Sequence, residues 1–103
     1  MIPIKQGDTL GLFVFYKDDE GVGSSLEDVI VEADIKLRTA RVHFRVVKYD
    51  QAVHPGKFTL TIDKDVTVTL PKGPYDCDIK YTSGGTTVRT ESFTIKVLEA
   101  VTL

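Results

Sequence analysis

Two histidines and one cysteine have the widest chemical repertoire in this chain. His43 and His54 are eleven positions apart, and Cys77 is the single cysteine among 103 residues. A metal site needs several converging ligands, and a nucleophilic cysteine needs a base beside it. Cys77 alternates with acidic residues on a predicted strand, so its side chain is expected in the core, where thiols are normally inert. We therefore expect structural roles for all three.

Other groups of charged residues and glycines also lack the spacing that chemistry requires. The acidic run at 18–20, followed by glycines at 21 and 23, lacks the ligand positions of an EF-hand. Asp76 and Asp78 alternate along a predicted strand, which is typical of a solvated face. Acids on the neighbouring strand offset a basic group that could otherwise bind phosphate, namely Arg38, Arg41, Arg45 and Lys48. We expect no catalytic residue, no metal ligand and no cofactor.

Composition and charge exclude several classes of partner. The net charge is -2 with a pI near 5.6, and both halves of the chain are nearly balanced in charge, so no nucleic-acid partner is expected. The longest apolar run is far too short to span a bilayer, and the first residues lack the layout of a secretory leader. We expect no membrane association. A single cysteine forms no internal disulfide, which favours a reducing compartment.

A β-hairpin in the second half of the chain is the strongest structural prediction. Residues 75–81 and 93–97 each alternate apolar with polar side chains, the period of a strand with one buried face. Gly84-Gly85 lies between them, where a two-residue turn requires positive φ. This hairpin is expected at the centre of a sheet.

The alternation also predicts the register of the hairpin. A two-residue turn pairs Tyr81 with Val88. Continued without change, that register would bury a charge, so one extra residue near 90–92 is expected to form a β-bulge and pair Cys77 with Phe93. A three-residue turn is the competing solution.

Five further segments have strand character, and turn residues separate them. They are residues 2–5, 9–16, 29–37, 41–49 and 58–62. Pro3 fits the first of them to an edge position. Residues 63–70 fit an irregular strand and a helical turn equally well.

Segments 29–37 and 41–49 are expected to pair as a second hairpin. The register that sets apolar against apolar side chains places Ile35 opposite Phe44 and Asp34 opposite Arg45. The apolar phase then flips, and a bulge near residues 46–47 would account for the flip.

Together these segments predict an all-β chain that forms one domain over residues 1–103. The count is six or seven strands, with turns every eight to twelve residues. That pattern is typical of an immunoglobulin-like antiparallel β-sandwich, although the Cys-Trp-Cys set of antibody domains is absent.

Apolar side chains away from the core faces predict a protein-protein contact. Phe13 and Phe15 lie opposite the main apolar face of their strand, and Val47, Tyr49 and Val88 are out of phase with their neighbours. The N-terminal strand and the C-terminal tail are the expected sheet edges, which can template a partner strand. The alternative is that both faces of segment 9–16 are covered within one sandwich. The candidate partner contacts are Ile2, Ile4, Phe13, Phe15, Val88 and Leu103.

Turn and strand motifs along nearly the whole chain resemble one known family. They are MIPIKQGDT at 1–9, YKDDEG at 16–21, GKFTL at 56–60, LPKGPY at 70–75 and DIKY at 78–81. The chain is similar to the small immunoglobulin-like domains of tailed-bacteriophage virion proteins, in particular the N-terminal domain family of the phage baseplate upper protein. The resemblance implies a phage or prophage structural module in the tail, baseplate or head. Such a module is assembled in the bacterial host cytoplasm and resides in the virion.

Two functions from different classes follow. The first is a non-enzymatic virion protein that binds other virion proteins, with self-association left open. The second is a carbohydrate- or cell-surface-binding β-sandwich that uses exposed aromatic side chains, for which Tyr49, Tyr75 and Tyr81 are the candidates. The absence of tryptophan and the inward alternation of Tyr75 and Tyr81 disfavour the second function.

Overall fold

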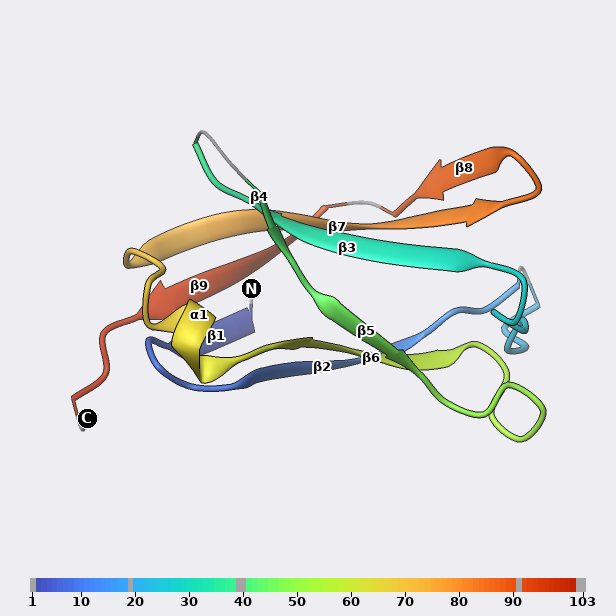
Figure 1. Cartoon of the computed structure of the whole chain (residues 1–103), viewed down its shortest axis with the longest axis horizontal. Coiled ribbons are helices and arrows are strands. Elements are labelled where there is room, and N and C mark those ends of the chain that lie inside the picture. Colours follow the sequence, from blue (N-terminus) through green and yellow to red (C-terminus); the bar gives the residue numbers. More distant parts are fainter. Residues whose placement is uncertain (1, 19, 39–40, 91, 102–103) are drawn as a thin grey trace.

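Two β-sheets face each other and enclose the core. The structure, a computed structural model, describes residues 2–18, 20–38, 41–90 and 92–101. Within these ranges the chain forms nine strand segments and one helical turn (Figure 1). They are β1 (Ile2–Lys5), β2 (Leu10–Phe15), β3 (Ile30–Lys36), β4 (Arg41–His43), β5 (Arg45–Lys48), β6 (Lys57–Ile62), α1 (Lys64–Thr67), β7 (Gly73–Ser83), β8 (Thr86–Arg89) and β9 (Phe93–Leu98).

The order of the strands defines the fold class. The larger sheet has the order β1-β9-β7-β3-β4, with β8 paired to β7, and the smaller sheet has the order β2-β6-β5. Immunoglobulin-like sandwiches place strands C, F and G in one sheet and B, E and D in the other. Here β3, β7 and β9 take the places of C, F and G, while β2, β6 and β5 take those of B, E and D. The prediction of an all-β, immunoglobulin-like sandwich is confirmed.

The first and last strands lie side by side and run in the same direction. β1 pairs with β9 in parallel, from Ile2 opposite Ile95 to Lys5 opposite Leu98. The other strand pairs of both sheets in the described ranges are antiparallel. β1 therefore lies at one edge of the larger sheet, as Pro3 predicted.

The predicted register of the central hairpin is confirmed. Tyr81 lies opposite Val88, and Gly84 and Gly85 have φ of 56° and 83°. Cys77 lies opposite Phe93, so the register changes by one residue between β8 and β9, as a bulge requires. Within the predicted bulge, residue 91 lies outside the described residues.

The predicted register between segments 29–37 and 41–49 is wrong by two residues. Ile35 lies opposite Val42 and Asp34 lies opposite His43. The predicted strand is in fact two strands, because the chain leaves the larger sheet at Phe44 and joins the smaller one as β5. The passage between the two sheets can be followed in Figure 1. The predicted bulge at 46–47 is wrong, because β5 pairs with β6 in one unbroken register from Arg45 to Lys48. Val46 stays half-buried while Val47 is 49% exposed, so the out-of-phase apolar residues lie on the outer face. Part of the predicted loop, at 39–40, lies outside the described residues.

The core lies between the inner faces of the two sheets. The β6 side chains of Phe58, Leu60 and Ile62 are at most 4% exposed, because β6 is the middle strand of the smaller sheet. Across from them lie the inward residues of β3, β7 and β9. The buried apolar residues are Ile4, Leu10, Leu26, Val31, Ala33, Ile35, Phe44, Phe58, Leu60, Ile62, Leu70, Cys77, Ile79, Tyr81, Ile95 and Val97.

The connection between β6 and β7 closes one end of the sandwich. The ambiguous segment 63–70 contains a single helical turn, α1, whose Thr67 Oγ1 donates to the carbonyl of Asp8 at 2.6 Å. The Tyr75 hydroxyl donates to the carbonyl of Pro71 at 2.6 Å. A tyrosine at this corner, two residues before the F-strand cysteine position, is a recurrent immunoglobulin-like feature, and that position is occupied here by Cys77. No helix among the described residues is long and apolar enough to cross a membrane.

Candidate interaction site

The side chains with chemical potential lie apart from one another. Cys77 is 2% exposed in the core, as predicted, and burial raises the pKa of its thiol from 9.0 to about 12. His43 contacts the carboxylate of Asp34 on the outer face of the larger sheet. His54 lies in the turn before β6 and packs on the Tyr49 ring at 6.0 Å between ring centroids. Within the described residues no three His, Cys, Asp or Glu side chains are grouped to hold a metal ion.

Burial of two ionisable side chains predicts a loss of stability at alkaline pH. Burial also raises the pKa of Tyr81 from 10.0 to about 12, with Tyr16 adding to the shift. Above pH 9 the unfolded chain releases the Cys77 proton while the folded protein retains it, so folding stability falls as pH rises. The neutral Cys77 thiol makes its full contribution to folding stability below pH 9.0, and this contribution is lost as the pH approaches about 12.

Replacing Cys77 by valine isolates the contribution of the thiol to the loss of stability at alkaline pH. We expect the urea midpoint of the wild type to decline from about pH 9 upward. In Cys77→Val the decline should begin only above 10.0, where unfolded Tyr81 ionises. If the urea midpoint began to decline at the same pH in the wild type and in Cys77→Val, the role assigned to the thiol would be wrong.

The outer face of the larger sheet carries paired charges. Lys80 of β7 lies opposite Glu32 of β3, and the two form an ion pair at 3.3 Å. Asp34 lies opposite His43 of β4, and their side chains are in contact. Other pairs on this face carry like charges, since Asp78 lies opposite Asp34 and Arg41 lies opposite Lys36, so this part of the face is charged and not apolar.

The outer face of the smaller sheet is apolar and exposed. Phe13 of β2 and Val47 of β5 both lie opposite Thr59 of β6, so the three side chains form one row across the sheet. Phe13 is 59% exposed, Val47 is 49% exposed, and Tyr49, just after β5, is 40% exposed. The Tyr49 ring packs edge-on against Phe13 at 5.8 Å between centroids. We call Phe13, Val47, Tyr49 and Thr59 the aromatic face.

Lysines border one end of the aromatic face. Phe15 continues β2 beyond Phe13 and is 38% exposed. The Nζ atoms of Lys17 and Lys57 lie 5.1 and 5.8 Å from the centroid of the Phe15 ring. Both distances suit cation–π contacts, so this end of the face combines an apolar ring with positive charge.

The six predicted contact residues are distributed over several surfaces. Phe13 and Phe15 lie on the outer side of the smaller sheet, as predicted. Ile4 is only 7% exposed and its side chain belongs to the core, so the predicted contact at edge strand β1 would use its backbone and not this side chain. Ile2 is half-buried on β1, and Val88 is 57% exposed on β8, both in the larger sheet. Leu103 lies outside the described residues.

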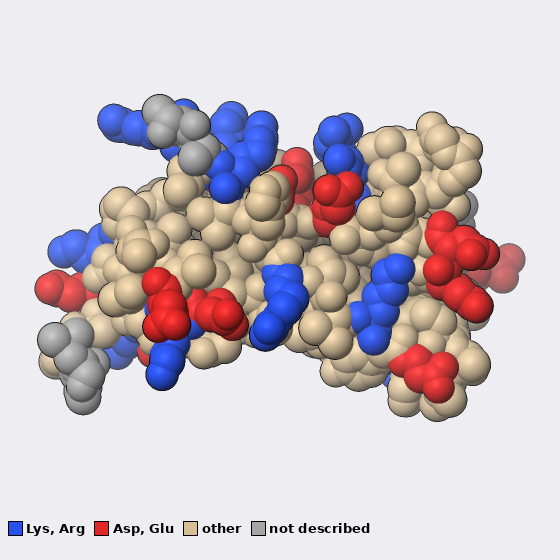
Figure 2. Space-filling model, in the orientation of Figure 1, with Lys and Arg blue, Asp and Glu red and all other residues tan. Residues whose placement is uncertain are grey.

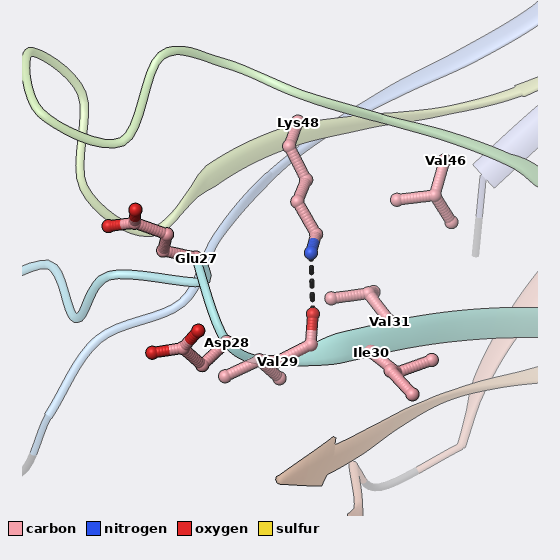
Figure 3. A pocket seen from close by; sticks show the side chains of 7 residues that line it. All are labelled: Glu27, Asp28, Val29, Ile30, Val31, Val46 and Lys48. Atoms are coloured by element: carbon pink, nitrogen blue, oxygen red, sulfur yellow. Dashed lines mark hydrogen bonds between the residues drawn. The ribbon is translucent and has the colours of Figure 1, made fainter.

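A lysine spans a hollow between β5 and the start of β3. Figure 3 shows the Lys48 ammonium directed at the carbonyl of Val29, while Glu27 and Asp28 point away from it. Lys48 Nζ donates to the carbonyl of Val29 and, at 3.0 Å, to that of Leu26. These bonds use two of its three donors, so Lys48 ties the end of β5 to the segment that leads into β3.

A second hollow of about 810 Å³ lies where β3 turns toward β4 and the α1–β7 connection passes. In Figure 2, basic side chains gather over this corner, and Lys36, Arg38 and Lys72 line the hollow. Lys72 is 3.6 Å from Glu99, and Asp76 also lines the hollow. In the described part of the chain every buried side-chain nitrogen or oxygen has a hydrogen-bond partner, so no polar group there awaits a ligand.

Comparison with known proteins adds little to this geometry. No protein-family model and no curated protein matches the chain. Among solved structures, the chain is similar to that of murine CRIg, with 13% identity over 96% of this chain and 91% of the other, at a TM-score of 0.47. The assignment to the immunoglobulin-like sandwiches rests on the strand order and sheet pairing.

Proposed function

We propose that the protein is a non-enzymatic binding module of a tailed-bacteriophage virion, which joins other virion proteins through the aromatic face. The virion setting is supported by the resemblance of the turn and strand motifs to phage immunoglobulin-like domains. The contact surface is supported by one observation, the exposure of Phe13, Val47 and Tyr49 on a single sheet face.

The contrast between the two outer faces supports the choice of surface. The outer face of the larger sheet is charged at Glu32, Asp34 and Lys80, whereas the row from Phe13 to Val47 exposes apolar groups with no charged residue in the row. Exposed apolar patches bordered by polar residues commonly mark interaction sites, and aromatic side chains dominate the energy of such contacts. The nearby Lys17 and Lys57 favour a partner that presents acidic groups beside an apolar centre.

A charged substitution on this face tests the proposal. Purified protein is mixed with separately produced tail, baseplate and head components, and binding is measured by co-sedimentation and by titration. We expect Val47→Glu to weaken binding by roughly tenfold or more, because it buries a carboxylate against an apolar partner.

Val68→Glu is the matched control. Val68 is 55% exposed, similar to Val47, but lies at the end of α1 and away from the aromatic face. It should bind as the wild type does. Equal binding by both variants would remove the aromatic face from the proposal, and no binding to any virion component would overturn the proposal itself.

Carbohydrate binding is the second candidate, and one observation favours it. Tyr49 and Phe13 present exposed rings beside the hydroxyl of Thr59, as a sugar-binding platform would. Two other candidate tyrosines are not available, because Tyr81 is 6% exposed and the Tyr75 hydroxyl is bonded to Pro71. A glycan array on which the wild type binds and Tyr49→Ala does not would favour this candidate.

A further inference from the structure

Within the described part of the chain, strand β2 leaves one side of its backbone unpaired. It is the end strand of the smaller sheet, and its neighbour on one side is β6. The amide of Tyr16 donates to the carbonyl of Gly56, which fixes the even-numbered residues of β2 as the hydrogen-bonded pairs with β6. The N–H and C=O groups of Gly11, Phe13 and Phe15 therefore point outward. No described residue beyond the sheet forms a backbone hydrogen bond with them.

Strand β2 also lacks the features that protect sheet edges. Natural edges usually carry proline or charged residues. Edge strand β1 contains Pro3, edge strand β4 contains Arg41, and edge strand β5 contains Arg45. The sequence of β2 is LGLFVF, with neither a charge nor a proline.

The core beneath β2 is incompletely covered. The inward residues Leu12 and Val14 of β2 are half-buried, whereas Phe58 and Leu60, their partners on β6, are fully buried. A strand added beside β2 would bury Leu12 and Val14 further, just as β2 helps to bury Phe58 and Leu60. The edge therefore gains apolar burial as well as backbone hydrogen bonds when it is occupied.

Gly11 has no role in the isolated chain that requires a glycine. Its φ is not positive, and a Cβ atom built on it meets nothing within 4 Å. Glycine within a strand lowers stability, and it often marks close approach of another chain. The space above Gly11 lies on the outer side of the sheet, the same side as Phe13 and Phe15.

We infer that β2 pairs in antiparallel fashion with β2 of a second copy of this chain, around a two-fold axis at Phe13. In this register Phe13 lies opposite its symmetry mate and Leu12 lies opposite Val14 of the partner. Gly11 then faces Phe15 of the partner, whose ring fills the empty space, an arrangement known to stabilise edge glycines. The three residues with outward backbone groups form hydrogen-bonded pairs with the same three residues of the partner.

The occupant is a second copy because β2 is complementary to itself. A single register pairs the free backbone groups of β2, buries Leu12 and Val14 further, and fills the empty space at Gly11. The two smaller sheets become one six-stranded sheet, and the two aromatic faces become continuous. The inference deepens the proposed function by giving the binding surface two-fold symmetry, but the dimer itself is tested without any virion protein.

The test is the mass of the protein in solution. Light scattering coupled to gel filtration should give twice the chain mass of 11.4 kDa. Gly11→Val fills the space that Phe15 of the partner needs, so its dimer dissociation constant should rise by roughly tenfold or more. The same substitution should raise the melting temperature of the monomer, because valine suits a strand better than glycine does. A structural role for Gly11 would instead lower that temperature.

Amide hydrogen exchange identifies the surface used. On dimerisation, exchange should slow at Gly11, Phe13 and Phe15, whereas the amides of Leu12 and Val14 are already bonded to β6 and should change little. A monomer at concentrations up to about 1 mM would overturn the inference. So would a dimer without slowed exchange at these three amides, or slowing that appears only when another protein is added.

The inference and the proposed function fail separately. Val47→Glu alters β5, the strand at the far side of the smaller sheet, so it should leave the dimer intact while weakening binding to virion components. A monomeric protein that still binds virion components would refute the dimer alone. A dimer that binds none would refute the proposed function alone.

Discussion

Replacing Phe58 by alanine is expected to lower the free energy of unfolding by about 3–5 kcal/mol. Phe58 is fully buried on β6, and its ring contacts Tyr81 of the opposite sheet with 6.2 Å between centroids. The substitution removes most of a core side chain and leaves a cavity between two sheets that cannot close without moving a strand. Urea unfolding followed by fluorescence or circular dichroism measures the change.

Phe13→Ala is the control for this substitution. Phe13 lies on β2 of the same sheet, but its ring is on the outer side and is 59% exposed. We expect a change in unfolding free energy of less than about 1 kcal/mol, together with weaker binding to a virion partner. If the two alanine variants lost similar stability, the division of this sheet into a core face and an exposed face would be wrong.

Gln51→Leu is expected to lower the free energy of unfolding by about 2–4 kcal/mol, although Gln51 lies in a loop. Its Oε1 atom accepts from the amides of Leu26 and Gly56, both at 2.9 Å, and its Nε2 atom donates to the carbonyls of Tyr49 and Lys57. The leucine variant keeps the volume of the side chain and leaves two amides of partly buried bonds without an acceptor. Unsatisfied groups of this kind cost more than the bonds themselves contribute.

Gln6→Leu provides the comparison for Gln51. Among the described residues the Gln6 side chain donates one hydrogen bond, from Nε2 to the carbonyl of Leu70 at 2.8 Å. Its loss should cost only about 1 kcal/mol in the same urea titration. Equal costs for the two leucine variants would show that the loop before β3 is not held by Gln51.

The central hairpin could be predicted from the sequence because two independent constraints agree there. Gly84-Gly85 specifies a tight turn, and the alternation around Cys77 and Phe93 specifies which side chains are buried. At Phe44 the only available constraint was alternation. Val42, Phe44 and Val46 keep one inward alternation although the chain passes from one sheet to the other between them. Alternation alone therefore predicts one continuous strand, so the register of β4 and the existence of β5 could not be predicted.

The aromatic face could be predicted only in part. The outward position of Phe13 follows from alternation within β2, and Val47 and Tyr49 were already out of phase in the sequence. That these residues meet depends on β2 and β5 being the two neighbours of β6, which is a fact of topology. The role of Gln51 has no sequence pattern at all, because its partners are backbone groups brought together by the fold.

The parallel alignment of β1 and β9 determines how the protein bears mechanical load. Tension applied to the two ends of the described chain pulls neighbouring parallel strands in opposite directions along their length. The backbone hydrogen bonds between β1 and β9, from the Ile2–Ile95 pair to the Lys5–Leu98 pair, are then loaded in shear at the same time and do not break one after another. A single-molecule pulling experiment should therefore record one high-force rupture.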